Sequence, residues 1–272
     1  MKVYYNTNIE KKHSGGVIAI GNFDGLHLGH QKVINEAKEK AKKNKLPFGI
    51  ITFEPIPVMF FNPKIKNHRI NSLNQKKTYL EKFNLDFLII INFNKTFSSL
   101  TAEQFIKNII YKKTKCKFLF VSKNFKFGFR RQGNILTLKK YEKTYNYKNL
   151  VTKPYKKNNK IISSTLIRKN IKLGKIQEIN KILNREWCIM GKVIEGNKLG
   201  KKIGFPTCNM KIDNYVIPKL GVYAVKVKGP KFSKKGIANI GYRPTVDGQN
   251  LLLETNIFGI NKNLYNKEIS VS

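Results

Sequence analysis

Two histidines close together among glycines are the clearest chemical signal in this sequence of 272 residues. His27 and His30 belong to the stretch GNFDGLHLGH, residues 21–30. Imidazoles at positions i and i+3 of a helix start can point the same way, so both can donate hydrogen bonds to one anion. Gly21 and Gly29 let the backbone approach a phosphate closely. The pattern predicts a phosphate site for nucleotidyl transfer, in which the histidines stabilise charge on phosphate oxygens.

The residues around this stretch favour that interpretation. The apolar run VIAIG (17–21) predicts a buried strand, and HQKVINEAKEKAKK (30–43) predicts a helix. The glycine-rich stretch then lies at a strand-to-helix turn, where unpaired N–H groups and the helix dipole attract anions. An exposed polar turn is the alternative. A zinc pair is disfavoured, because helical zinc pairs are spaced four residues apart and no third ligand lies near.

A second candidate phosphate site is ISSTLIR, residues 162–168. Ser163, Ser164 and Thr165 offer hydroxyl groups at a predicted helix start, and Arg168 can bind a phosphate with two parallel hydrogen bonds. An ordinary helix N-cap is the alternative for this stretch.

The elements that must position these residues follow two patterns. Up to about residue 120, apolar runs at 47–53, 85–93 and 117–122 alternate with predicted helices at 74–83 and from Thr101, where Gln104 completes a capping-box pattern. Strands that are apolar throughout and joined by helices predict a parallel sheet covered on both faces. We therefore expect an N-terminal doubly wound, Rossmann-like α/β domain that binds ligands at the carboxyl ends of its strands.

After about residue 184 the pattern changes to short strand-like runs separated by Gly, Asn, Pro and Asp. Such runs predict a small antiparallel β-barrel. The sequence thus predicts two domains, 1–184 (α/β) and 185–272 (all-β).

Composition limits the class of protein. The chain holds 53 basic and 16 acidic residues, a net charge of +37, but Lys is spread through every segment. A basic nucleic-acid-binding protein is therefore an alternative and not the leading hypothesis. The positive electrostatic field also favours anionic small substrates.

No apolar run approaches the ~20 residues of a membrane span, so we expect a cytoplasmic protein. Cys116, Cys188 and Cys208 form no CxxC pattern and predict neither a disulfide framework nor a zinc site.

Four stretches of the first half together resemble the bacterial bifunctional riboflavin kinase/FMN adenylyltransferases, also called FAD synthetases. They are GNFDGLHLGH, TFEPIP (52–57), NFKFGFRRQGN (124–134) and ISSTLIR. The resemblance implies that the FMN phosphate attacks the α-phosphorus of ATP, giving FAD and pyrophosphate with the help of Mg²⁺. It assigns catalysis to His27, His30 and Arg168, ATP binding to Gly21, Phe23, Asp24, Gly29, Ser163, Ser164 and Thr165, and flavin binding to Asn124 and Phe127.

The second half resembles the riboflavin kinase domain of the same family. GKVIEGNKLGKKIGFPTCN (191–209) is similar to its glycine-rich loop and G-F-P-T-x-N motif, and ANIGYRPTVDG (238–248) is similar to a second segment. The resemblance implies a riboflavin-kinase-type barrel that makes FMN from riboflavin and ATP. It assigns ATP binding to Gly196, Lys202 and Gly204, Mg²⁺ binding to Thr207 and Asn209, flavin binding to Arg243, and the general base to Glu254.

The chain departs from this family at its end. The last run, KEISVS, stops at Ser272, where members of the family continue. We therefore expect a C-terminally truncated barrel with an exposed edge, an incomplete riboflavin pocket and an impaired kinase. Another HxGH-type adenylyltransferase is the alternative enzyme, but such enzymes lack the GFPTCN barrel. The expected partners are ATP, FMN and riboflavin, with neither a specific nucleic acid nor a membrane; the sequence leaves the oligomeric state open.

Overall fold

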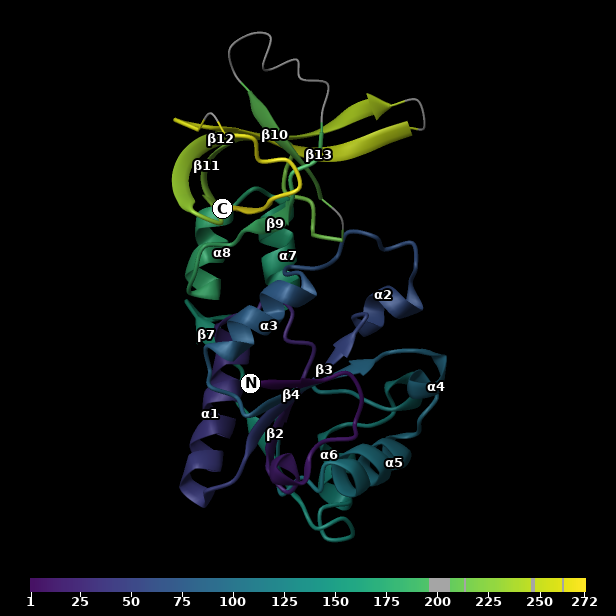
Figure 1. Ribbon diagram of the computed structural model, residues 1–272. Coiled ribbons are helices and arrows are strands. Elements are labelled where there is room, and N and C mark those ends of the chain that lie inside the picture. Colours follow the sequence, from purple (N-terminus) through teal and green to yellow (C-terminus); the bar gives the residue numbers. More distant parts are fainter. Residues whose placement is uncertain (196–205, 213, 246–247, 261) are drawn as a thin grey trace. The chain divides into compact units, whose positions relative to one another are not determined.

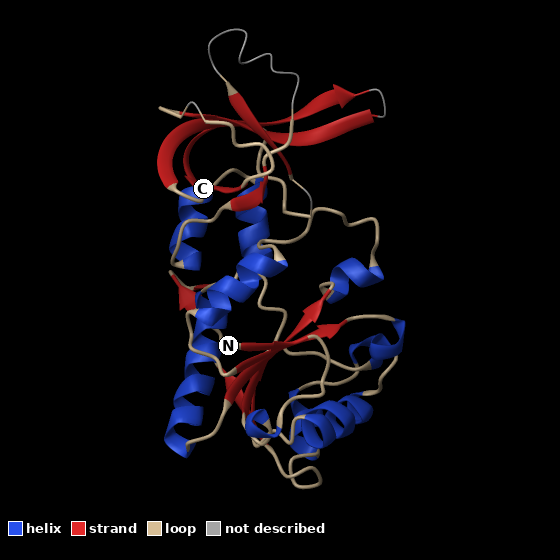
Figure 2. Cartoon of the chain, in the orientation of Figure 1, coloured by secondary structure: helices blue, strands red, loops and turns tan. Residues whose placement is uncertain are grey.

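The computed structural model describes residues 1–195, 206–212, 214–245, 248–260 and 262–272 (Figure 1). The chain divides into two compact units. One unit comprises Met1–Ile65 and Lys76–Ser163, and the other comprises Lys66–Gln75 and Ser164–Ser272. A parallel sheet organises the first unit and an antiparallel sheet the second (Figure 2).

The sheet of the first unit has the strand order β1-β4-β3-β2-β5-β6, and all of its pairings are parallel. This confirms the predicted doubly wound domain. Two strands were not predicted, since the three residues of β1 and the mixed run KNLVT of β6 carry little apolar periodicity. The strands are β1 (Lys2–Tyr4), β2 (Val17–Ile20), β3 (Phe48–Glu54), β4 (Phe87–Asn92), β5 (Phe118–Ser122) and β6 (Lys148–Thr152), and a small hairpin adds β7 (Lys156–Lys157) and β8 (Lys160–Ile161).

Helices cover this sheet. The predicted capping box is confirmed: the Gln104 N–H donates to Thr101 Oγ1 at 3.1 Å and the Thr101 N–H donates to Gln104 Oε1 at 2.9 Å. The helix that it opens changes to π-helix after one turn. The helices of the unit are η1 (Lys11–His13), α1 (Leu28–Asn44), α2 (Pro57–Phe61), α3 (Leu73–Glu81, which starts in the other unit), α4 (Lys95–Ser98), α5 (Ala102–Phe105), η2 (Ile106–Lys113), η3 (Phe129–Arg131) and α6 (Ile135–Lys140).

The order of the strands predicts where a ligand would bind. β2 lies between β3 and β5, so the chain first builds the sheet toward one side of β2 and later returns to the other. Such a switch in strand order opens a crevice at the carboxyl ends of the strands. GNFDGLHLGH follows β2, TFEPIP spans the end of β3, and NFKFGFRRQGN follows β5. Three of the four motifs therefore lie along the carboxyl edge of adjacent strands.

The second unit contains helices α7 (Ser164–Lys172) and α8 (Ile176–Leu183) and a sheet with the order β10-β13-β12-β11-β14-β9. Its pairings are antiparallel. The outer strands approach each other where the Ile194 N–H donates to the Asn209 carbonyl at 2.8 Å, which almost closes the barrel and confirms the prediction. The strands are β9 (Ile189–Lys192), β10 (Thr207–Lys211), β11 (Gly221–Gly229), β12 (Phe232–Thr245), β13 (Gly248–Ile257) and β14 (Glu268–Val271).

The expectation of an exposed edge at β14 was wrong. β14 pairs with β11 on one side and with β9 on the other. Ser272 extends the first pairing, because its N–H and carbonyl exchange hydrogen bonds of 2.9 and 2.8 Å with Lys226. Four residues are enough for β14 to have a neighbour on both sides. The expectation of an impaired kinase therefore finds no support in an open edge at β14.

A buried histidine in the first unit makes its stability depend on pH. The His13 ring stacks on Phe87 with centroids 5.1 Å apart, and its Nδ1 lies 2.8 Å from the Tyr4 hydroxyl. Burial, assisted by the charge of Lys12, lowers the pKa of His13 below its ordinary 6.5. The unfolded chain therefore binds a proton at a higher pH than the folded chain does. The stabilisation is present above that ordinary value and is lost as the pH falls below it.

We expect the midpoint of thermal unfolding to fall less between about pH 7.5 and 5.5 in His13→Phe than in the unmodified chain, because phenylalanine keeps the ring stack and cannot bind a proton. Calorimetry across this pH range measures the difference between the two proteins. Parallel declines would show that His13 does not contribute to the acid sensitivity.

Candidate active sites

The turn between β2 and α1 is buried and strained. Phe23, Gly25 and Leu26 have positive φ values of 46°, 83° and 43°. Phe23 is 2% exposed and Asp24 is 1% exposed. A left-handed conformation costs a residue with a side chain roughly 1–3 kcal/mol and persists only where the surroundings enforce it, often at a functional site. The conformation of GNFDGL therefore depends on groups outside the turn.

Three side chains hold this turn through its carbonyl groups. Thr52 Oγ1, from the TFEPIP motif, donates to the Asn22 carbonyl at 3.1 Å, and Lys76 Nζ donates to the same carbonyl at 2.8 Å. Gln31 Nε2 donates to the Leu26 carbonyl at 2.9 Å. Sequence reasoning missed Lys76, because nothing in its spacing distinguishes it among 53 basic residues.

The two histidines meet at the start of α1. His27 is the N-cap residue, and its Nδ1 accepts the His30 N–H at 3.3 Å. The two rings stack, with centroids 3.7 Å apart and planes 17° from parallel. When neutral, an imidazole whose Nδ1 accepts a hydrogen bond carries its proton on Nε2. His27 can thus donate from Nε2 to an anion at the helix start.

The glycines of the motif allow this packing. A Cβ atom at Gly29 would lie 3.1 Å from the His27 ring, and one at Gly21 would lie 3.3 Å from the Phe23 ring. Side chains at these positions would push the rings away. Glycine at these two positions therefore lets the Phe23 and His27 rings lie against the backbone. This packing role is additional to the predicted close approach of a phosphate.

The segment after β5 forms a cavity of about 380 Å³. Asn124 lines it, as expected for a residue that contacts a ligand, but Phe127 lies in the hydrophobic core and contacts Phe105. The neighbouring Phe125, which sequence reasoning missed, lines the cavity and stacks on Phe127 with centroids 5.4 Å apart. The two stacked rings therefore differ in surroundings: Phe125 lies at the cavity, and Phe127 lies behind it in the core.

The predicted phosphate clamp is divided between the two units. Ser163 ends the first unit, and α7 begins at Ser164 in the second, as the hydroxyl-rich helix start predicted. Thr165 is exposed and Arg168 is half-buried on α7. The Arg168 Nε donates to the His68 carbonyl at 2.9 Å, so one edge of the guanidinium is held by the same unit.

In the barrel, four polar side chains share one face of neighbouring strands. Glu254 on β13 lies in register with Asn209 on β10 and with Asn239 on β12, and residues paired in this way point to the same side of an antiparallel sheet. Thr207 lies two residues before Asn209 and therefore on this face too. The structure thus brings together the predicted general base and the two predicted metal ligands.

Asn209 is suited to hold a cation. It is 5% exposed, and its Oδ1 is buried without a hydrogen-bond partner among the residues that the structure describes. A buried carbonyl oxygen without a donor is costly, and Mg²⁺ prefers such hard oxygen ligands together with phosphate oxygens. The donors present therefore fit a magnesium ion bound with ATP.

A cavity of about 540 Å³ begins beside these residues. Its lining includes Thr207 and Cys208, and it combines apolar residues such as Ile257 and Leu264 with the polar Lys262 and Asn263. Gly196, Lys202 and Gly204 lie outside the described residues. Arg243 pairs with Asn250 in the β12–β13 ladder, and its side chain is likewise outside the description.

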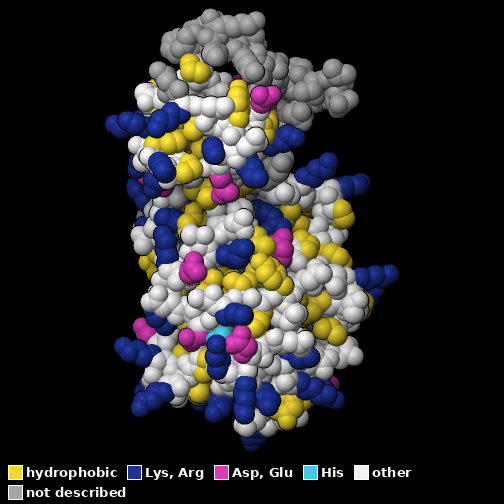
Figure 3. Space-filling view, viewed as in Figure 1, with side chains coloured by type: hydrophobic (Ala, Val, Ile, Leu, Met, Phe, Trp, Pro, Cys, Tyr) yellow, Lys and Arg dark blue, Asp and Glu magenta, His cyan; other side chains and the backbone are white. Residues whose placement is uncertain are grey.

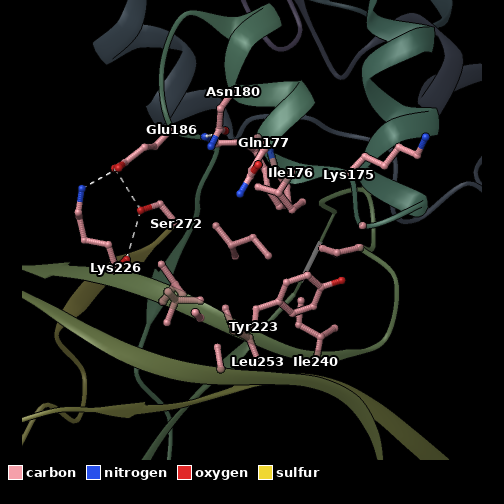
Figure 4. Close-up of a pocket in the computed structure, with 18 of the residues that line it drawn as sticks. Lys175, Ile176, Gln177, Asn180, Glu186, Tyr223, Lys226, Ile240, Leu253 and Ser272 are labelled. Atoms are coloured by element: carbon pink, nitrogen blue, oxygen red, sulfur yellow. Dashed lines mark hydrogen bonds and ion pairs between the residues drawn. The ribbon is translucent and has the colours of Figure 1, made fainter.

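A larger pocket of about 660 Å³ lies in the second unit, lined by α8 and the strands β11 to β14 (Figure 4). Ile240 and Leu253 form part of its floor, and Lys226 Nζ binds Glu186 at 2.7 Å at its edge. Ile240 follows Asn239 and Leu253 precedes Glu254, so both point to the face of the sheet opposite Asn239 and Glu254. This pocket holds none of the predicted site residues.

Basic side chains do not gather at one place on the face drawn in Figure 3. Lys and Arg side chains are spread across the visible faces of both units (Figure 3).

Cys116 and Cys188 are buried, as expected of packing residues, and Cys208 is partly buried. Among the described helices, none has the length and apolar character needed to span a membrane.

Comparison with known proteins places both halves of the chain. The FAD synthetase family model matches residues 9–166, and the riboflavin kinase model matches residues 183–272. The chain is 42% identical to the bifunctional riboflavin kinase/FMN adenylyltransferase of Buchnera aphidicola subsp. Schizaphis graminum, over 97% of this chain and 86% of the relative. It is 35% identical to the protein of that name from Escherichia coli K12, over 94% and 82% of the two chains.

A solved structure agrees in fold. The crystal structure of a protein named macrolide-efflux protein, from Streptococcus pneumoniae, matches with a TM-score of 0.86 and 29% identity over 99% of this chain and 88% of that one. Two family models that together span nearly the whole sequence, in the order of the α/β unit and the barrel, agree with the curated relatives. The chain therefore belongs to the bifunctional riboflavin kinase/FMN adenylyltransferase family.

Proposed function

We propose that the chain makes FAD from riboflavin in two ATP-dependent steps, one in each unit. The observation that carries this proposal is the stacked pair His27 and His30 on a strained turn at the switch point of the sheet. The same chain also holds a barrel in which Glu254 lies in register with Asn209. Another HxGH adenylyltransferase would explain the first feature but not the second.

In the first unit, a phosphate oxygen of FMN attacks the α-phosphorus of ATP and the bond to pyrophosphate breaks. Negative charge develops on the oxygens of the α-phosphate and of the leaving group. His27 Nε2, His30 and the N–H groups at the start of α1 donate to these oxygens. Gly21, Phe23, Asp24 and Gly29 form the wall against which ATP is positioned.

The remaining assignments in this reaction concern ATP phosphates and the flavin. The ISSTLIR motif supports a role for Arg168 in binding ATP phosphates, with Ser163, Ser164 and Thr165 as candidate hydroxyl donors. Asn124 and Phe125 line the flavin side, while Phe127 supports Phe125 from the core. No covalent intermediate with the enzyme is needed, because positioning and charge stabilisation account for phosphoryl-type transfer.

In the second unit, Glu254 removes the proton from the 5′-hydroxyl of riboflavin as its oxygen attacks the γ-phosphorus of ATP, and ADP leaves. Asn209 and Thr207 would hold Mg²⁺, which when bound neutralises phosphate charge. The 540 Å³ cavity beside Thr207 has a partly apolar lining that suits the adenine ring. The resemblance to the family assigns ATP binding to Gly196, Lys202 and Gly204 and flavin binding to Arg243.

The test is an assay of each step with the purified chain, ATP and MgCl₂, with the flavins separated by chromatography. We expect FMN to be converted to FAD and riboflavin to be converted to FMN. Absence of FAD from supplied FMN would refute the first assignment. Absence of both FMN and FAD after incubation with riboflavin would refute the second and leave the first standing.

A further inference from the structure

Lys76 is an unusual lysine for its position. It lies in the first turn of α3 and is 1% exposed. Its Nζ lies 2.8 Å from the Asn22 carbonyl and 3.4 Å from Thr52 Oγ1. Burying an ammonium group is costly, and a cation at a helix N-terminus is also disfavoured by the helix dipole. Both effects disfavour a lysine at this position. The charge and length of its side chain therefore have a role other than stabilising the helix.

The contact determines the orientation of one peptide group. In a trans peptide the C=O and N–H bonds point in opposite directions. Because the Asn22 carbonyl points toward Lys76 and Thr52, the N–H of Phe23 in the same peptide group points away from them. This peptide belongs to the turn in which Phe23 and Leu26 are left-handed. Without the ammonium group, one of the two donors that hold the carbonyl in place is lost.

We propose that Lys76 is a positioning residue for adenylyl transfer: it holds the Asn22–Phe23 peptide so that the turn presents its N–H groups and His27 to the phosphates of ATP. The buried ammonium also adds positive charge beneath this turn. The inference rests on the proposed function of the first unit. It concerns FAD formation alone, because Asn22, Thr52 and Lys76 all belong to that unit.

The test compares Lys76→Met with Lys77→Met, its neighbour on the same helix, which contacts only the Tyr5 hydroxyl at 3.5 Å among the bonds that the structure describes for it. We expect Lys76→Met to lower kcat for FAD formation by about 10- to 100-fold, a typical range for loss of part of a preorganised anion site. The riboflavin kinase rate of the same protein should stay within about twofold of the unmodified chain. Lys77→Met should leave both rates unchanged.

A second variant separates position from charge and covers the case in which Lys76→Met does not fold. Lys76→Gln has no charge but can still donate to the Asn22 carbonyl, so we expect its rate of FAD formation to lie between those of Lys76→Met and the unmodified chain.

Rates of FAD formation equal to that of the unmodified chain in both variants would overturn the proposal. Equal loss of both activities, or a lowered unfolding midpoint that accounts for the loss, would assign Lys76 a merely structural role and also overturn it. If the unmodified chain makes no FAD, the proposed function itself fails, and this outcome is distinct from a failure of Lys76 alone.

Discussion

Replacing His27 or His30 should lower the rate of FAD formation from FMN by about 10²–10³-fold, the typical cost of one preorganised donor to a developing oxyanion. The centroids of the two rings lie 3.7 Å apart, so in the proposed site both imidazoles would act on the same phosphates. Residues that act as a unit are not additive, so the double variant should be little slower than either single variant. Steady-state assays with ATP and FMN measure these rates.

The choice of substitution matters because His27 also caps α1. Alanine would remove the cap, at a cost of roughly 1 kcal/mol in stability, as well as the Nε2 donor. His27→Asn keeps a good N-cap and loses the Nε2 donor, so it isolates the catalytic contribution. For each variant, riboflavin phosphorylation in the other unit is the internal control. If His27→Asn and His30→Ala both make FAD at the unmodified rate, the histidines are not the phosphate donors.

The second large effect should come from Glu254→Gln, which we expect to lower riboflavin phosphorylation by about 10²–10⁴-fold, the range for loss of a general base. Glutamine keeps the size of the side chain and its place opposite Asn209 but cannot accept the proton of the 5′-hydroxyl. Conversion of riboflavin to FMN, followed by chromatography, measures the loss. FAD formation from supplied FMN should be unchanged.

Glu268→Gln is the matched control for this experiment. Glu268 lies on β14 of the same barrel, is exposed, and pairs in register with Lys192 on β9. Its substitution removes the same charge from the same sheet and should leave the kinase rate within about twofold of the unmodified chain. An equal loss in both variants would indicate a general effect of charge, and full kinase activity in Glu254→Gln would exclude Glu254 as the base.

Several features of the fold could be predicted because they are written in short stretches of sequence. Apolar runs such as VIAIG predict buried strands of a parallel sheet, and the Thr101–Gln104 capping box forms as expected. Short runs separated by turn residues correctly predict the antiparallel barrel. The three-residue β1 and the mixed β6 escaped prediction, because their place in the sheet comes from pairing with distant strands.

The sequence by itself determined the fold class of each half, the family and the location of the histidine turn, since each depends on neighbours within a few positions. Only the tertiary structure decided which side chains hold that turn, which ring of FKF faces the cavity, and that β14 has a partner on both sides. Lys76 and Asn22 are 54 positions apart, and Asn209 meets Glu254 across two strands. Such contacts depend on burial and on strand register, which no local pattern encodes.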